Sequence, residues 1–327
     1  ANERIYCAQY NNILYMTDGY SRWKYNGTFF NRMGVSAPSG EISAKCGGTG
    51  ALSGVYNWKY TYVNSYGVES NGNSAMAAAL TITSAGQASL TSLSPGNASS
   101  LGVNGIRIYR TTAVASANST AGTVYYLVES ISAINSTYTD NTTDGSLTTS
   151  IPVVNYPPPS AAVQVLHKDR MFYGVKQWGD LSSGGTRVYW SNVASPEIVD
   201  TTTDFQRFGD GDEKVMGLVP VADQLLVLKE NSVWELYIPQ TSDTLSWYPH
   251  KTPSEYGSET LSFASPFLNG VMVYNRYGFV SVSGSGETVS TIQLPSDSYK
   301  SKILSVPIED QLLDNVLFTA LNRLSGI

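Results

Sequence analysis

The sequence predicts an all-β protein, a β-propeller that carries an inserted β-sandwich. Three observations support this prediction: the composition, a repeated strand pattern, and one long interruption of the repeat. The 327 residues include 22 Tyr, 6 Trp and 29 Gly, while charged residues make up only 14%. Aromatic side chains suit half-buried strands and glycines suit turns. The low charge argues against disorder and against long helices held by salt bridges.

Four segments share one pattern: a polar turn, four nearly apolar residues, a short gap and a second strand. These segments begin at Tyr10, His167, Ala222 and Leu268. A continuous apolar run indicates a strand covered on both faces, such as an inner strand of a propeller blade. The last three starts are separated by 55 residues (222 − 167) and 46 residues (268 − 222). A four-stranded blade takes roughly 40–50 residues, so each segment is interpreted as part of one blade.

The first interval is 157 residues long (167 − 10), so a separate domain must be inserted there. The sequence therefore predicts three parts. Residues 1–36 form a first blade segment, residues 37–160 form the inserted sandwich, and residues 161–327 form further blades. The insertion is rich in Ser, Thr, Ala and Asn and ends at Pro157-Pro158-Pro159, a stiff linker. Short strands separated by turns are typical of a β-sandwich. We expect them at 54–63, 79–83, 88–93, 105–111, 124–131 and 136–140, with a turn at Asn64-Ser65-Tyr66-Gly67.

The strand expected at 54–63 alternates strictly and places four aromatic side chains on one face: Tyr56, Trp58, Tyr60 and Tyr62. Exposed rings could stack on sugars. A sandwich must bury one face of each sheet, so packing in the core is the favoured interpretation.

Near the C-terminus, leucines and a valine at helical spacing predict a short helix at 309–316. No closing strand follows, so we expect blades of the propeller to be missing from this chain. The first residues, Ala1-Asn2-Glu3-Arg4, contain neither an initiating Met nor a signal peptide. Processing or a longer parent chain would each explain that start.

The sequence predicts no enzyme, with no catalytic, cofactor-binding or metal-binding residues and no cofactor. It contains no Gly-x-Ser-x-Gly motif. His167 is expected to open a strand and His250 to lie in a turn, neither acting as a base. The loops 209–213 and 140–145 contain Asp and Gly that could bind Ca²⁺. Both lack further acidic ligands, so plain turns are favoured.

Cys7 and Cys46 are the only cysteines, and they are expected to be two buried thiols or one disulfide. The formal net charge of −6 argues against tight binding of nucleic acid, which usually needs a basic excess. It is compatible with a wall along which DNA slides. No apolar run approaches the roughly 18 residues of a membrane span, so we expect no membrane partner.

Two sets of motifs resemble proteins of bacteriophage tails. Tyr60-Thr61-Tyr62-Val63, Gly67-Val68-Glu69-Ser70 and Gly105-Ile106-Arg107-Ile108-Tyr109-Arg110-Thr111 resemble the fibronectin-type-III-like module, an immunoglobulin-like sandwich, of phage structural proteins. Arg187-Val188-Tyr189-Trp190-Ser191-Asn192 with Ser195-Pro196-Glu197, and Asp223-Gln224-Leu225-Leu226-Val227-Leu228, resemble the tail hub or nozzle proteins of short-tailed phages.

This resemblance implies a virion structural protein of the phage tail, made in the cytoplasm of the bacterial host. It implies a homo-oligomeric ring, six-fold in the best-known relatives, that contacts the portal and adaptor and the tail fibre or other tail proteins. Genomic DNA would pass through the ring during ejection without specific binding. The alternative is a receptor- or glycan-binding tail adhesin that acts through the sandwich. A carbohydrate-active enzyme would instead need a cleft lined by paired acids.

Overall fold

The computed structural model describes residues 5–93, 102–115, 117, 120–132, 137–175, 186–209, 213–240, 243–254, 256–258, 264–267, 270–275, 278–283 and 289–292. Regular structure in these ranges is almost entirely antiparallel β-sheet, as the sequence predicts. It forms six small open sheets, together with two 3-10 turns at Asp144–Ser146 and Thr244–Ser246. The helix expected at 309–316 lies outside the described residues.

Four of the sheets have four strands each, and the strands follow one another in chain order. Sheet 1 consists of β1 (Tyr6–Tyr10), β2 (Ile13–Thr17), β3 (Arg22–Tyr25) and β4 (Phe30–Arg32). Sheet 2 consists of β11 (Ala161–His167), β12 (Arg170–Val175), β13 (Arg187–Trp190) and β14 (Phe205–Arg207). Sheet 3 consists of β15 (Val215–Val221), β16 (Gln224–Lys229), β17 (Val233–Tyr237) and β18 (Tyr248–Lys251). Sheet 4 consists of β19 (Ala264–Phe267), β20 (Gly270–Asn275), β21 (Gly278–Ser283) and β22 (Val289–Ile292).

The repeated pattern corresponds to the second and third strands of these four sheets. Its apolar runs form β2, β12, β16 and β20, and each pairs with the strand that follows it. The first strand of each sheet was not predicted, and two residues separate it from the second strand in the sequence. Three of these two-residue loops lie in the described ranges, and in two of the three both residues have positive φ, as at Lys168 and Asp169 (46° and 57°). Such loops match the twist of antiparallel strands.

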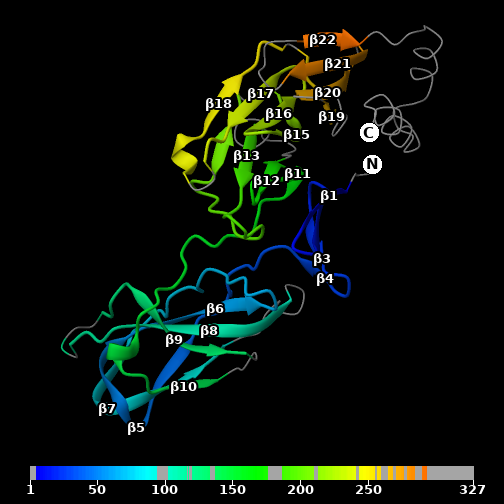
Figure 1. Ribbon diagram of the computed structural model, residues 1–327. Coiled ribbons are helices and arrows are strands. Elements are labelled where there is room, and N and C mark those ends of the chain that lie inside the picture. The colour runs from blue at the N-terminus through cyan, green and yellow to red at the C-terminus, as the bar shows by residue number, and fades with distance from the viewer. Residues whose placement is uncertain are drawn as a thin grey trace.

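A hydrophobic cluster lies between each pair of consecutive sheets. Met171 and Tyr173 pack toward sheet 1, whereas Phe172 between them packs toward sheet 3. Successive side chains of a strand point to opposite faces, so a strand covered on both faces needs an unbroken apolar run. The first strands β1, β11, β15 and β19 lie next to one another in that order, with the later strands of each sheet farther out (Figure 1).

The insertion contains the other two sheets, with strand orders β10-β7-β5 and β6-β8-β9. Their bounds are β5 (Ser43–Tyr56), β6 (Trp58–Asn64), β7 (Leu80–Thr91), β8 (Val103–Thr111), β9 (Tyr125–Ile131) and β10 (Tyr138–Asp140). Both sheets contribute side chains to one hydrophobic core. In Figure 1 this unit stands apart from the four stacked sheets and joins them at a narrow waist.

The structure corrects three strand predictions in the insertion. The segment 54–63 is not one strand, because it changes sheets at Asn57. The strands expected at 79–83 and 88–93 are parts of the single strand β7. The long strand β5, which begins at Ser43, was not predicted before residue 54. The expected turn is confirmed, since Gly67 N–H donates to Asn64 O at 3.0 Å.

Candidate functional site at the waist

The chain enters and leaves the insertion at the same place. Gly34 follows β4 and has φ of +74°, and a methyl group built on it would lie 2.6 Å from Cβ of Pro157. Only glycine combines this conformation with such a close approach. Pro157 belongs to the proline run that leads back to β11. The two ends of the insertion are therefore held against each other.

A buried ion pair fastens this crossing to the sheets. Lys24 of β3 donates to both carboxylate oxygens of Glu197, at 2.6 and 2.8 Å. The two side chains are 1% and 2% exposed. Gly34 N–H also donates to Glu197, at 2.8 Å. Burial lowers the pKa of Lys24, and the Glu197 carboxylate offsets part of that shift.

The pair joins three parts of the chain. Lys24 belongs to sheet 1, and Glu197 lies in the connection between β13 and β14 of sheet 2. The ammonium group also lies 4.2 Å from the ring centroid of Tyr66, in the turn after β6 of the insertion. A desolvated cation over an aromatic face contributes about 2 kcal/mol. This contact fixes one loop of the insertion directly to the two sheets.

Hydrogen bonds close the junction around the ion pair. Thr17 Oγ1 donates to Ala161 O at 2.6 Å, and Ser160 Oγ donates to Tyr20 O at 2.8 Å. Tyr156 exchanges backbone hydrogen bonds with Val199. The returning connection is thus tied to both sheets, and the waist is a joint held by several hydrogen bonds.

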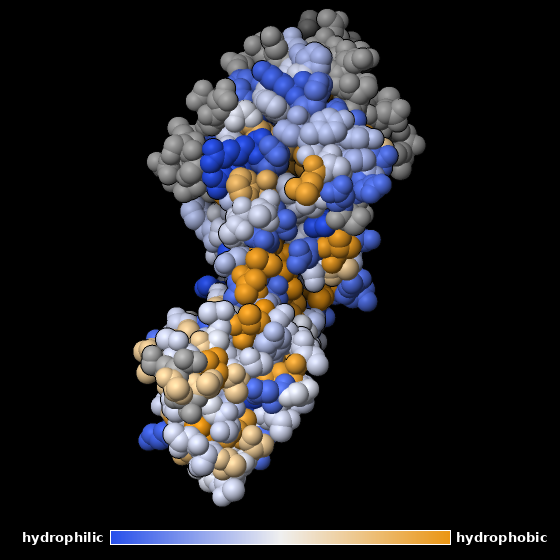
Figure 2. Space-filling model, turned by 90° about the vertical axis from the view of Figure 1, so that its left-hand side faces the viewer, coloured by the Kyte–Doolittle hydropathy of each residue, from blue (hydrophilic) through white to orange (hydrophobic). Residues whose placement is uncertain are grey.

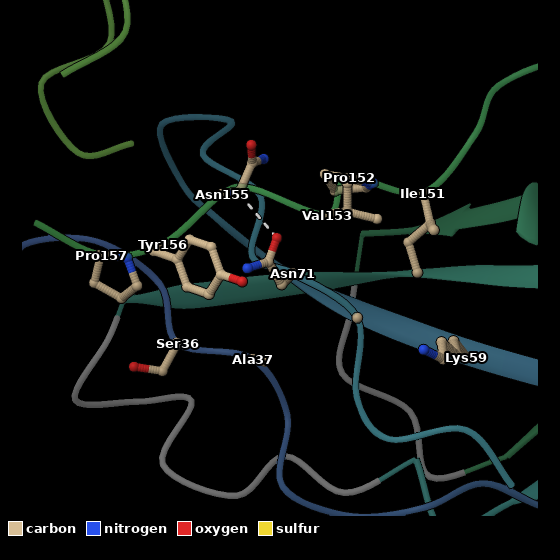
Figure 3. Close-up of a pocket in the computed structure, with 11 residues that line it drawn as sticks. Ser36, Ala37, Lys59, Asn71, Ile151, Pro152, Val153, Asn155, Tyr156 and Pro157 are labelled. Carbon is tan, nitrogen blue, oxygen red and sulfur yellow. Dashed lines mark hydrogen bonds between the residues drawn. The ribbon is translucent and has the colours of Figure 1, made fainter. Parts of the chain in front are cut away.

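Beside the joint lies a partly open cavity of about 490 Å³. It is bordered by the outgoing connection at Ser36, by Lys59 and Asn71 of the insertion, and by the returning connection at Tyr156 (Figure 3). Asn155 N–H donates to Asn71 Oδ1 at 2.8 Å, which holds the returning connection against the insertion. Lys59 is the one charged side chain of this lining, and its ammonium lies 4.9 Å from the ring centroid of Tyr125.

Apolar side chains gather on the surface of the waist (Figure 2). In the returning connection Val153 is 68% exposed and Val154 41% exposed. Tyr156 and Val193 are also exposed. Exposed apolar side chains gathered at this joint are suited to contact with another protein surface.

Two polar clusters hold the insertion together internally. Fully buried Arg110 donates to Asp140 at 2.9 Å and to Asp144 at 2.6 Å, and Trp58 Nε1 also donates to Asp140. The carboxylates of the candidate Ca²⁺ loop 140–145 therefore neutralise a guanidinium group. In the second cluster Glu69 accepts from Thr61, Arg107 and Tyr109. Burial and the Glu69 carboxylate raise the pKa of Tyr109.

The four aromatic side chains of 56–62 are packed in the core. Their exposed fractions are 2%, 0%, 0% and 4%, and all belong to the core of the insertion. The favoured interpretation of this aromatic face is confirmed. Stacking on sugars is not available to buried rings.

The structure places the two histidines differently from the sequence prediction. His167 ends β11 instead of opening a strand. Its buried Nε2 has no hydrogen-bond partner in the described part of the chain, and burial lowers its pKa. His250 lies in strand β18 instead of a turn, and it is exposed opposite Glu235. The two side chains belong to different sheets.

The cysteines and the remaining acidic loop also differ from expectation. Cys7 and Cys46 are free and exposed, so neither buried thiols nor a disulfide is found. Glu213 accepts from Ser232 at 2.6 Å and lies 3.8 Å from Lys229, whereas 210–212 lie outside the described ranges. Across the described ranges, no three His, Cys, Asp or Glu side chains are grouped to hold a metal ion.

Sequence comparison finds no relative of this chain. No family model matches the sequence, and no curated protein matches it. No helix in the described ranges has the length and apolar character needed to cross a membrane.

Proposed function

We propose that this chain is a structural protein of a bacteriophage tail, a hub or nozzle subunit that assembles into a ring around the path of the genome. The resemblance of its strand motifs to such proteins motivates the proposal. The observation that carries it is the serial stacking of four four-stranded sheets with their first strands side by side. Blades of a propeller are arranged in this way, and they give a wall a fixed radius.

In this proposal the four sheets are blades of a β-propeller, and the insertion is a fibronectin-type-III-like sandwich. Two three-stranded sheets around one core support the second assignment. The buried Lys24–Glu197 pair and the contact between Gly34 and Pro157 hold the sandwich at a set angle. A rigidly projecting domain with apolar side chains at its base is suited to contact a neighbouring subunit or another tail protein.

The sandwich offers less support to a glycan-binding adhesin. Exposed rings in the 56–62 strand or its loops would favour that alternative, and the four rings of the strand, Tyr56, Trp58, Tyr60 and Tyr62, are buried. A ring wall needs interfaces and a surface to which DNA does not adhere. The net charge of −6 favours such a surface because it repels phosphates.

The native mass of the assembly tests the proposal. Mass photometry of the purified full chain is expected to give a closed oligomer. A six-fold ring of the 35.3 kDa chain would have a mass of about 210 kDa (6 × 35.3 kDa). Electron microscopy of intact particles should then place this ring in the tail. A stable monomer that binds glycans on an array would contradict the proposal and favour the adhesin.

A further inference from the structure

Within the described ranges, no sheet covers the face of sheet 1 whose counterparts in the other sheets are covered. In β12, β16 and β20 the second residue packs against the preceding sheet and is 0% exposed. These residues are Met171, Leu225 and Val271. Leu14 holds this position in β2 and is only half-buried. The fourth residue of each strand repeats the contrast. Met16 is half-buried, whereas its counterparts Tyr173, Val227 and Val273 are at most 1% exposed.

This open face continues on the flanking strands of sheet 1. Trp23 of β3 pairs with Met16, and Cys7 of β1 pairs with Met16 from the other side. Cys7 is exposed. The residue that corresponds to Cys7 in sheet 2 is Gln164, which is 7% exposed and donates to Tyr15 O of sheet 1 at 2.7 Å.

The sequence after sheet 4 repeats a hairpin of sheet 3. Val306-Pro307-Ile308-Glu309-Asp310-Gln311-Leu312-Leu313 matches the segment from Val219 to Leu226 at six of eight positions. The segment in sheet 3 forms the end of β15, its two-residue loop and the start of β16. The chain distance also fits, since Asp310 follows Asn269 by 41 residues (310 − 269) and Asn269 follows Asp223 by 46 (269 − 223).

The residues between the two expected strands of segment 306–313 are also of the type found in the four known hairpins. The second residue of each two-residue loop is Asn or Asp, a type that tolerates positive φ. Asp310 occupies this place in the new segment. The four known positions are Asn12, Asp169, Asp223 and Asn269.

We propose that residues 302–327 supply a hairpin of a fifth sheet, and that this hairpin covers the open face of sheet 1. These residues lie beyond β22 and outside the described ranges. The 35 residues after Ile292 (327 − 292) suffice for several strands of about five or six residues each. The match favours a hairpin over the helix that leucine spacing alone predicts for 309–316. The inference does not depend on the role in a phage tail.

The hairpin register assigns a direction to each leucine. Leu225 packs toward sheet 2 and Leu226 toward sheet 4, the preceding and the following sheet. Their counterparts are Leu312 and Leu313, so Leu312 faces sheet 4 and Leu313 faces sheet 1. Between sheets 1 and 2, Tyr15 lies beside Gln164, which donates to its carbonyl. Leu313 corresponds to Tyr15, and Cys7 corresponds to Gln164. Leu313 is therefore expected beside Cys7.

Cross-linking in the full chain tests this placement. In a C46S background Cys7 is the only native thiol, and L313C adds a second. Copper-catalysed oxidation by dissolved oxygen should join the two thiols by a disulfide within one chain, because facing side chains of packed sheets interdigitate. L312C is the matched control, and its yield should be at least about tenfold lower because adjacent residues point to opposite faces. Peptide mass spectrometry of the monomer band gives both yields.

A second measurement needs no substitution in the segment. In the C46S chain, maleimide should modify Cys7 at least about tenfold more slowly in the folded state than in urea, because a packed sheet excludes the reagent. Equal rates would overturn the proposal. Equal yields from L312C and L313C, or no product from either, would also overturn it. Cross-links between two chains would show that a second copy occupies the open face.

Discussion

Lys24 and Glu197 illustrate how much a single buried charge depends on its partner. Replacing Glu197 by Gln leaves the ammonium of Lys24 without a counter-charge at 1% exposure. We expect the free energy of unfolding to fall by about 3–5 kcal/mol. The midpoint of urea unfolding, followed by tryptophan fluorescence, measures the change.

A surface ion pair provides the control for that substitution. Lys168 and Asp223 are 2.7 Å apart but 23% and 69% exposed. Replacing Asp223 by Asn should leave the midpoint of urea unfolding almost unchanged, because water screens an exposed ion pair. The double variant K24M/E197L should recover much of the loss, because an apolar pair of similar volume carries no desolvation cost. A loss from E197Q no larger than from D223N would contradict the buried role.

His167 should make the free energy of unfolding fall on acidification. Burial, and then the charge of Lys168, lower its pKa in the folded chain. The unfolded chain therefore binds this proton more readily, and stability falls as the pH drops below the ordinary pKa of about 6.5. In H167Q the loss of melting temperature between about pH 7.5 and about pH 5.5 should be smaller.

The control for this substitution is H250Q, which changes an exposed side chain in another sheet. If H167Q and the parent chain lose the same number of degrees on acidification, carboxylates alone cause the pH dependence. The comparison is made by differential scanning fluorimetry at constant ionic strength.

At the scale of the connecting elements, Gly34 decides how closely the two ends of the insertion approach. In G34A the new methyl group would meet Pro157 at 2.6 Å in a backbone conformation with φ of +74°. The unfavourable φ costs about 1–2 kcal/mol and the overlap about 1–3 kcal/mol. We expect a loss of about 2–5 kcal/mol in chemical unfolding, together with faster proteolysis in the returning connection.

Gly27 is a matched control for Gly34. Its φ is +93°, but nothing lies within 4 Å of a methyl group built there. G27A should therefore show only the conformational cost of about 1–2 kcal/mol. Similar losses from the two variants would mean that the contact with Pro157 contributes little.

The hairpins were predictable because their signals are local. A polar two-residue turn followed by an apolar run, as at Lys168 and Asp169, specifies where the second strand begins. The first strands have weaker signals, and their place depends on the sheet they join. The strand β5 was missed because Gly47, Gly48 and Gly50 lower strand propensity. Gly50 is nevertheless needed, since a methyl group there would lie 2.5 Å from Gly86 O.

The candidate site at the waist could not be found from local patterns. In Arg22-Trp23-Lys24-Tyr25 the alternation does not tell which face is inside. Lys24 and Glu197 are 173 residues apart in the chain and meet only after sheets 1 and 2 have stacked. Asp140 and Asp144 resembled cation ligands because the sequence does not reveal that Arg110 lies between them.

For the whole molecule, the charge balance predicts weak contact with nucleic acid. With a net charge of −6, the chain should not bind duplex DNA at about 10 μM protein and about 0.15 M salt, because non-specific binding depends on the release of counterions by basic side chains. Fluorescence anisotropy of a labelled duplex measures this. Binding that weakens steeply with added salt would contradict the expectation and reveal a local basic surface.

The contact between Gly34 and Pro157 also makes the insertion an exchangeable cassette. Its two ends already touch, so sheets 1 and 2 do not depend on the length of chain between them. By the entropy of loop closure, each halving of that chain changes the free energy by only about 0.6 kcal/mol. A different domain with adjacent termini could therefore be grafted between these two residues while the stacked sheets are retained, at the cost of the contact between Tyr66 and Lys24. Recombination could use the same point to change what the projecting domain contacts.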